Sequence, residues 1–482
     1  MRDRADFPFG GLSVTTNRIR RPMASTTRPA LNLLDESRPM WKTLAVFLVP
    51  LMLSNIMQSA SQTFGSIFLG RLIGVDALAA VSAVFPVFFV LFSFLIGVGS
   101  GSTVLIGQAY GAKDLHKVKK IAGTVIGAAL AMGILAAVLG EIFAPAMLAA
   151  LGTPAKILHD SDNYSRVLFL SAPIFFPYLI YTTVMRGVGD AKTPFYALAF
   201  STILSIGLSP AFILGWFGLP RLGVVSVAVS SIIAQSVALA GLLLILRRRD
   251  DPLQLDGEML RDFIVDWRIF WTVLRIGIPT GIQVVLFALA EVAVISFVNR
   301  FGPSATAAYG AVNQIAGYVQ FPAVSLGIAA SIFGAQCIGA RREDRLREVV
   351  RSAVVLNYAI VGALAALCYL FSREILAWFI TDVKTLDIAN GLLMITLWSY
   401  TFFGNSSVIS GVMRSSGDVL VPMFNGIAAI WLVEVPAAYV LMQHFGIDGI
   451  WMGYALSFCV VLLLQFCYFE FFWKRRTHER LA

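Results

Sequence analysis

Two glutamates lie inside long apolar stretches of this 482-residue sequence, where an ionisable side chain is unusual. Glu291 sits in the run Leu286-Phe-Ala-Leu-Ala-Glu291, and Glu434 lies two residues before Pro436. A charged side chain at the centre of a bilayer costs about 2.5–3.5 kcal/mol on insertion scales. Burial favours the protonated form of a carboxyl group, and an approaching cation favours the charged form. A buried glutamate can therefore hold a proton or Na⁺ in one state and exchange it for a cationic molecule in another.

We predict that Glu291 is the ion-coupling residue and that Glu434 is a second ion or substrate contact. The alternative for Glu291 is a neutral carboxyl group hydrogen-bonded between helices, and the alternative for Glu434 is a salt-bridge partner. A histidine proton relay is not expected, because none of the four histidines lies in the middle of an apolar stretch. We expect no metal and no cofactor, only a coupling ion, H⁺ or Na⁺.

Amide and aromatic side chains recur on the apolar stretches around these glutamates. Gln283, Phe287 and Glu291 follow one another at i, i+4 spacing and so share a helix face. We expect a substrate cavity lined by Gln58, Gln62, Gln283, Asn313, Gln314, Tyr400 and Asn405. Interhelical amide hydrogen bonds, worth about 0.6 kcal/mol on average in a membrane, would explain the amides equally well.

The amino-acid composition is that of a membrane protein. Hydrophobic residues make up 58% of the chain and charged residues 13%, against about 45–50% and about 25% in soluble domains. This excludes a disordered protein, an ordinary nucleic-acid-binding protein and a soluble enzyme. The apolar runs are long and continuous, which favours helices over barrel strands. Twelve spans are predicted, at residues 44–68, 78–109, 121–143, 164–186, 195–217, 223–246, 272–298, 305–336, 350–371, 388–412, 420–443 and 447–472.

The basic residues predict the orientation and the domain limits. Of the 37 Lys and Arg, 30 fall on one side of the predicted spans, together with both termini, and 7 fall on the other. The positive-inside rule then places both termini in the cytoplasm of a cell (inner or plasma) membrane protein. We expect a disordered basic tail at 1–43, an N-terminal lobe at 44–246, a cytoplasmic linker at 247–271, a C-terminal lobe at 272–472 and a cytoplasmic tail at 473–482.

An internal repeat at an offset of 228–229 residues predicts the architecture. Each half holds six spans, so both enter the membrane from the same side, and a pseudo-two-fold axis along the membrane normal is expected to relate them. The fold class is an all-α polytopic membrane protein with twelve transmembrane helices in two six-helix lobes. A duplicated twelve-span chain is typical of a transporter. The repeated residues, assigned to gating or structural motifs, are Gln108, Gly111, Arg186, Gly189 and Asp190, with their counterparts Gln336, Gly339, Arg414, Gly417 and Asp418.

These motif residues have a mainly structural interpretation. The four glycines permit tight turns or helix ends. Arg186 and Arg414 lie at helix C-terminal ends, where a cation suits the helix dipole and can pair with Asp190 and Asp418 respectively.

The paired motifs resemble the multidrug and toxic compound extrusion (MATE) family. The resemblance rests on Gln108-Ala-Tyr-Gly111-Ala with its copy at 336–340, and on Arg186-Gly-Val-Gly-Asp190 with its copy at 414–418, and it covers residues 41–470. It implies an antiporter that exports organic, often cationic, compounds in exchange for H⁺ or Na⁺, and it matches Glu291 to the ion-coupling glutamate of one bacterial branch.

The chain departs from the family pattern at several acidic positions. The family's first-span Asp is replaced within Phe64-Gly-Ser66, the tenth-span acid falls near Phe403, and Ser205 and Ser209 stand where Asn and Asp are usual. With few acids, a neutral or amphipathic substrate becomes more plausible than in other members.

Two other functions are less consistent with the sequence. A lipid-linked glycan flippase of the same superfamily would be expected to carry basic residues in its cavity, and no Lys or Arg lies in the middle of a predicted span. A membrane-embedded enzyme is not expected, because the chain has no GxSxG, HExxH or Walker A pattern. We expect a monomer, not an enzyme, whose partners are small-molecule substrates and the bilayer, with no nucleic acid, and which works by rocking of its two lobes.

Overall fold

The computed structural model describes residues 38–481 except Ile264, so most of the predicted tail at 1–43 lies outside the described residues. The described part contains helices and no strands, which confirms the predicted fold class. The helices of the first half are α1 (Met40–Phe68), α2 (Val75–Gly111), α3 (Leu115–Ala150), α4 (Ala155–Leu170), α5 (Ala172–Gly187), α6 (Lys192–Leu214) and α7 (Ser226–Arg248).

The second half begins after the short linker helix α8 (Gly257–Arg261). Its helices are α9 (Trp267–Val298), α10 (Pro303–Ala340), α11 (Glu343–Leu370), α12 (Ser372–Ala377), α13 (Val383–Thr396), α14 (Tyr400–Ser415), α15 (Leu420–Ala428), α16 (Val435–Phe445) and α17 (Ile447–Phe471). Short π- or 3₁₀-helical turns join or follow several of them, namely η1 (Leu69–Ile73), η2 (Trp216–Gly218), η3 (Gly223–Val225), η4 (Asn299–Phe301), η5 (Leu397–Ser399), η6 (Ala429–Glu434) and η7 (Trp473–Arg475).

Eleven helical segments of the described chain are long and apolar enough to cross a membrane. The span predicted at 164–186 is broken: α4 and α5 meet at an angle of 51° and would make a twelfth span together. Pro173, in the first turn of α5, has no N–H to continue the hydrogen bonding of α4. At the corresponding place in the second half, α13 and α14 are joined by η5 and form one span.

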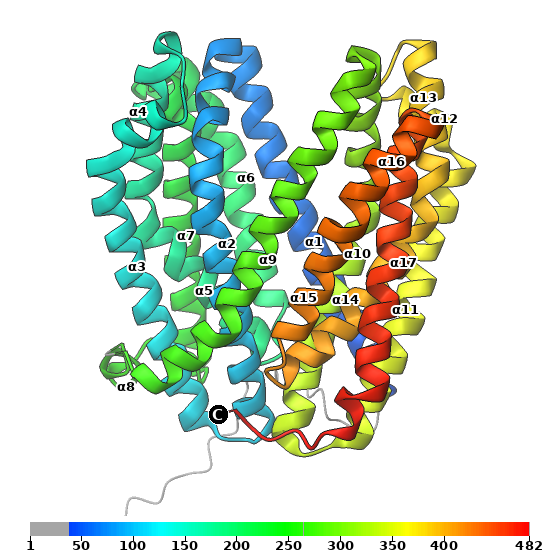
Figure 1. Ribbon diagram of the computed structural model, residues 1–482. Coiled ribbons are helices and arrows are strands. Elements are labelled where there is room, and N and C mark those ends of the chain that lie inside the picture. The colour runs from blue at the N-terminus through cyan, green and yellow to red at the C-terminus, as the bar shows by residue number, and fades with distance from the viewer. Residues whose placement is uncertain (1–37, 264, 482) are drawn as a thin grey trace, which may run out of the picture.

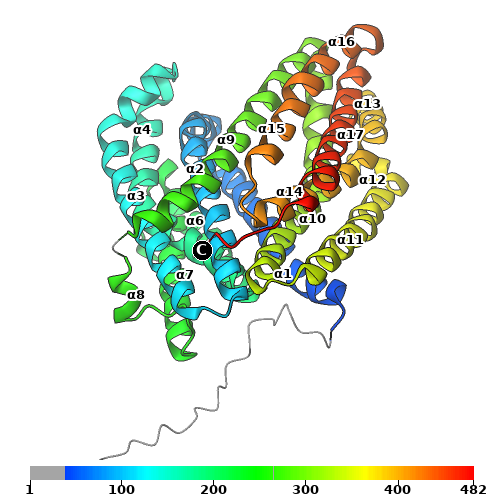
Figure 2. The same ribbon diagram turned by 60° about the horizontal axis from the view of Figure 1, so that its bottom comes forward.

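The two lobes interlock at one end of the bundle, which carries α8 and the C-terminal segment and is called the linker end below (Figures 1 and 2). The first residues of α1, including Leu44 and Phe47, belong to a core that also contains Leu326 and Phe333 of α10. In the same way Val273 of α9 packs in the core of the first half. Each lobe's first helix therefore starts against the other lobe.

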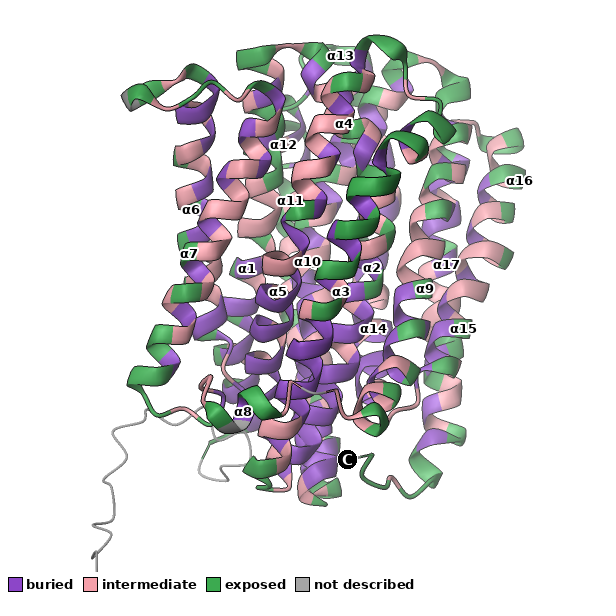
Figure 3. Ribbon diagram, turned by 90° about the vertical axis from the view of Figure 1, so that its left-hand side faces the viewer, coloured by how far each residue is buried: buried purple, intermediate pink, exposed green. Residues whose placement is uncertain are grey.

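Buried residues gather toward the linker end (Figure 3). Tight helix contacts explain this concentration. On α2, Gly97 and Gly101 lie so close to α9 that a Cβ at either position would overlap the carbonyl oxygen of Gly277 or Val273. Small residues at four-residue spacing allow this close approach of two membrane helices. Toward the opposite end the helices of the two lobes diverge (Figure 1).

The linker joins the lobes through polar contacts outside the spans. Asp266 caps the N-terminus of α9 by accepting from the backbone N–H of Arg268 at 3.0 Å, and it pairs with Lys120 of α3 at 2.7 Å. The hydrogen bond from Lys120 holds the pKa of the Asp266 carboxyl below its usual value. The start of α9 is thereby tied to the first lobe.

Candidate ion and substrate site

The Glu291 carboxylate is held by three hydrogen-bond donors from two other helices. Its Oε1 accepts from the Tyr309 hydroxyl and from Nδ2 of Asn313 at 3.0 Å, both on α10. Its Oε2 accepts from the Tyr454 hydroxyl of α17 at 2.9 Å. The two tyrosine oxygens lie 3.2 Å apart, so the hydroxyl groups and the carboxylate form one connected set. Three uncharged donors from two helices therefore hold the carboxylate in one orientation.

The helices fix these donors in place. Tyr309 and Asn313 are four residues apart on α10 and therefore share a face. The fully buried Trp451 ring packs against Tyr309 and Tyr454, with ring centroids 5.3 and 5.4 Å apart. Rigid aromatic packing leaves the hydroxyl hydrogens as the parts of this site that can move most easily.

Glu434 contacts α17 one turn away from Tyr454. It is 3% exposed and its Oε2 accepts a 2.7 Å hydrogen bond from Ser457, three residues after Tyr454. It ends η6, a π-helical turn that leads into α16, with Pro436 in the first turn of that helix. Such turns are rare and often mark functional sites. We call Glu291, Tyr309, Asn313, Tyr454, Ser457 and Glu434 the carboxylate network.

Within the described residues, neither glutamate forms an ion pair. The alternative prediction for Glu434, a salt-bridge partner, is therefore wrong in this structure. A serine hydroxyl occupies the place that a basic side chain would take. Two acidic groups without a fixed positive partner leave room for a mobile cation or proton to balance their charge.

Two of the residues predicted to line the cavity are interior residues of the second lobe. Asn405 is 3% exposed, and its Oδ1 accepts from Nδ2 of Asn357 on α11 at 3.0 Å. The buried Tyr400 packs edge-on against Phe458 at 5.3 Å. Asn405 on α14 is thus bound by Asn357 on α11, and Tyr400 is packed among aromatic rings. That either residue lines the substrate cavity stays a prediction.

The other predicted lining residues stay partly or fully exposed. Gln62 on α1 and Gln314 on α10 are exposed, and Gln58 is half-buried. Gln283 is half-buried and packs on α15, where a Cβ at Gly426 would lie 2.7 Å from its Nε2. Among the described residues, Asn313 is the one predicted lining residue that is hydrogen-bonded to Glu291. The role of the other amides in binding substrate stays a prediction.

The motif glutamines join the lobes at the linker end. Gln108 of α2 donates from Nε2 to the carbonyl oxygen of Ser415 at 2.8 Å. Gln336 of α10 donates from Nε2 to the carbonyl oxygen of Gly187 at 2.9 Å. Donors and acceptors are both separated by 228 residues, so the two hydrogen bonds are counterparts in the repeat. We call this pair the glutamine latch.

The motif glycines make the latch possible in two ways. Gly111 and Gly339 are helical, and a Cβ on either would overlap the carbonyl oxygen of Gln336 or Gln108 across the interface. Gly189 and Gly417 instead have positive φ, +95° and +85°, two residues beyond the last residues of α5 and α14. Glycine is therefore needed at 111 and 339 because the helices approach closely there. At 189 and 417 it is needed because of the backbone conformation.

The predicted pairs of Arg186 with Asp190 and of Arg414 with Asp418 are absent from the described residues. Asp190 accepts from the backbone N–H of Lys192 and Thr193, each at 3.0 Å. The unsatisfied N–H groups at the start of α6 bind this carboxylate in place of the arginine.

In the second repeat, Asp418 accepts from the Tyr468 hydroxyl at 2.7 Å, and Arg414 donates to Oγ of Ser410 at 2.9 Å. Here too the acid and the arginine have separate partners, so the predicted pairing is wrong in both halves.

Comparisons with known proteins agree with this arrangement. The MatE family model matches twice, at residues 50–211 and 279–440, which is once in each half and at the same offset as the repeat. The chain is 49% identical over 459 residues to the probable multidrug resistance protein YoeA of Bacillus subtilis, covering 95% of this chain and 99% of that protein. It is 24% identical over 448 residues to the probable multidrug resistance protein NorM of Thermotoga maritima, covering 91% and 95% of the two chains.

Solved structures show the same fold. The MATE transporter VcmN of Vibrio cholerae matches with a TM-score of 0.82 at 20% identity, covering 89% of this chain and 96% of that one. A structure described as an outward-facing conformation of a multidrug resistance MATE family transporter matches with a TM-score of 0.80 at 21% identity, covering 89% and 94%. A duplicated helical bundle of this kind defines a membrane transporter. The chain belongs to the MATE family, as its paired motifs predicted.

Proposed function

We propose that this protein is a multidrug efflux antiporter that exports small organic, cationic or amphipathic compounds as protons flow in. The observation that carries the proposal is the Glu291 carboxylate, which lies within a membrane-spanning helix with three donors and no basic partner among the described residues. Relatives named as multidrug resistance and multidrug export proteins support the class of substrate.

A proton fits the carboxylate network better than Na⁺ does. Protonation of Glu291 requires only that one hydroxyl of Tyr309 or Tyr454 turn from donor to acceptor. A sodium ion needs several oxygen lone pairs around it, whereas Asn313 presents its amide nitrogen to the carboxylate. Glu434, bound through Ser457 to the same face of α17, gives the network a second acid that a cationic substrate or a second proton can use.

The proposed cycle alternates access on the two sides of the membrane. We place the linker end in the cytoplasm, because the topology predicted from the sequence assigns 30 of the 37 Lys and Arg to that side. The glutamine latch then closes the cytoplasmic side in this structure, which corresponds to an outward-facing state. Proton loading of Glu291 from outside releases cargo, and rocking of the lobes opens the latch. We infer a monomer in the cell membrane, without cofactor and without catalytic activity.

Gradient-driven dye uptake into proteoliposomes tests this proposal. Vesicles with an acidic lumen are placed in neutral buffer containing ethidium, a cationic dye, and luminal fluorescence is followed. We expect the pH gradient to drive at least tenfold accumulation over protein-free vesicles, and an outward Na⁺ gradient at equal pH to drive none. Uptake driven by Na⁺ alone would overturn the choice of ion, and no uptake with either gradient would overturn antiport of cationic dyes.

A further inference from the structure

The segment after α17 crosses from its own lobe to the other one at the linker end. Residues 473–481, called the strap below, leave α17 and run toward α2 (Figures 1 and 2). The backbone N–H of Leu481 donates to Oε1 of Gln108 at 2.8 Å. Gln108 is the buried latch residue of the first lobe, so the strap ends its path on the latch itself.

Several contacts hold the strap along its own lobe. Trp473 donates from Nε1 to Oγ of Ser416 at 3.0 Å, directly before Gly417. The His478 ring stacks on Trp473 at a centroid distance of 3.9 Å. Burial lowers the pKa of His478, which favours the neutral ring in this stack. The Leu481 side chain packs on Gly417, where an added Cβ would lie 2.7 Å from its Cδ1.

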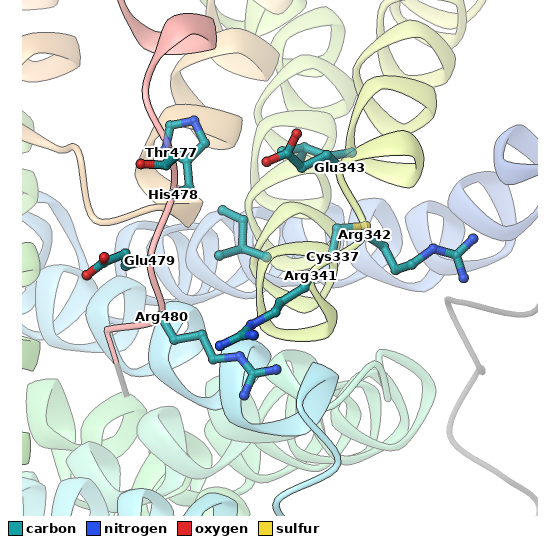
Figure 4. A pocket seen from close by; sticks show the side chains of 10 residues that line it. Cys337, Arg341, Arg342, Glu343, Thr477, His478, Glu479 and Arg480 are labelled. Atoms are coloured by element: carbon teal, nitrogen blue, oxygen red, sulfur yellow. The ribbon is translucent and has the colours of Figure 1, made fainter.

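The strap also covers a hollow beside the latch. Thr477, His478, Glu479 and Arg480 form one wall of a cavity of about 500 Å³, and the turn from α10 to α11, with Cys337 at its base, forms the other (Figure 4). The strap therefore contacts the latch at Leu481, while this cavity separates residues 477–480 from the turn between α10 and α11.

The contact with the Leu481 N–H adds to the preference of the Gln108 amide for one orientation. A glutamine amide can turn by half a rotation, which exchanges its donor and its acceptor. With the wrong orientation Oε1 would face the Ser415 carbonyl oxygen, leaving a buried acceptor without a donor, which costs about 1–3 kcal/mol. Because the Leu481 N–H can only donate, it requires Oε1 on its own side and so directs Nε2 to Ser415.

In the described chain no backbone N–H donates to the side chain of Gln336, the counterpart of Gln108. Gln336 makes one side-chain hydrogen bond there, from Nε2 to Gly187. The strap therefore breaks the symmetry of the latch. We propose that the strap is a third element of the gate, in which the Leu481 N–H positions the Gln108 amide and so holds the linker end closed. This inference rests on the alternating-access function proposed above.

Proline at position 481 tests the inference, because it removes the N–H. Spin labels are placed at Leu115→Cys and Arg347→Cys, which are exposed near the N-terminal ends of α3 and α11, in a chain whose native cysteines are replaced by alanine. The distance distribution is measured by double electron–electron resonance in lipid nanodiscs. With Leu481→Pro we expect the longer-distance, open-gate population to rise at least fivefold over the parent chain.

Leu481→Ala is the matched control, since it keeps the N–H and loses only the packing on Gly417. We expect less than half of the effect of proline. Removal of residues 476–482 is the second variant and should match Leu481→Pro, with an unchanged melting temperature for the bundle. An unchanged distribution in Leu481→Pro, or equal effects of proline and alanine, would overturn the positioning role. If the parent chain itself shows one distance with and without ethidium and at every pH, alternating access fails instead.

Discussion

Replacing Glu291 by glutamine is expected to reduce pH-driven ethidium accumulation at least tenfold, to the level of protein-free vesicles. Glutamine is nearly isosteric, its oxygen still accepts from Tyr309 and Asn313, and its NH₂ can donate to the Tyr454 oxygen. The bundle should therefore fold and insert normally. What the variant lacks is a group that exchanges a proton for a cation, so binding of cargo is no longer linked to the gradient.

Glutamine variants of two further glutamates serve as comparisons for Glu291→Gln. Glu141 pairs with Arg166 at 2.5 Å on the surface, 45% exposed, and Glu141→Gln should leave accumulation unchanged. Glu434→Gln should lower accumulation partially, because it removes the second acid but leaves Glu291 and its three donors intact. Wild-type accumulation by Glu291→Gln would remove this glutamate from the coupling mechanism.

A single methyl group at Gly339 is expected to disable the gate and reduce accumulation about tenfold. An alanine Cβ would overlap the Gln108 carbonyl oxygen, which belongs to the backbone of α2 and cannot turn aside. Overpacking a close contact costs about 1–3 kcal/mol, and each 1.4 kcal/mol changes an equilibrium constant tenfold. In the proposed cycle the contact forms only while the linker end is closed, so the cost falls on this state and favours the open one.

Gly310→Ala is the control on the same helix, since no atom lies within 4 Å of its added Cβ. In the spin-labelled pair on α3 and α11, Gly339→Ala should populate the longer distance, whereas Gly310→Ala should match the parent. A Gly339→Ala protein with parental distances and full accumulation would show that the glycine contact does not set the gate.

The spans and the repeat are predictable because they follow from local properties. Apolar run length and basic loops locate helices without any knowledge of what they touch. The predicted span 164–186 is present as a bent pair of helices, and the position of its break, at Pro173, depends on how α4 and α5 pack. Glu291 and Asn313 were identified as polar residues in apolar helices, which is also a local property.

The contacts of the site depend on distant parts of the chain and were not predictable in the same way. Tyr454 lies 163 residues from Glu291, and only the packing of α17 against α9 brings them together. Tyr309 had a usable signal, its four-residue spacing from Asn313 on one helix face. The partner of Gln108, the Ser415 carbonyl oxygen, lies in the other lobe, 307 residues away. The sequence marked the donor as a motif residue, but a backbone acceptor carries no residue-type signal.

Proton release on cargo binding tests the central claim most directly. Ethidium is titrated into the detergent-purified protein by calorimetry in two buffers of equal pH and different ionisation enthalpy. We predict that the wild-type chain releases protons as the dye binds and that Glu291→Gln binds dye without release. Dye binding by the wild type with no proton released, or equal release by Glu291→Gln, would contradict exchange at this carboxylate.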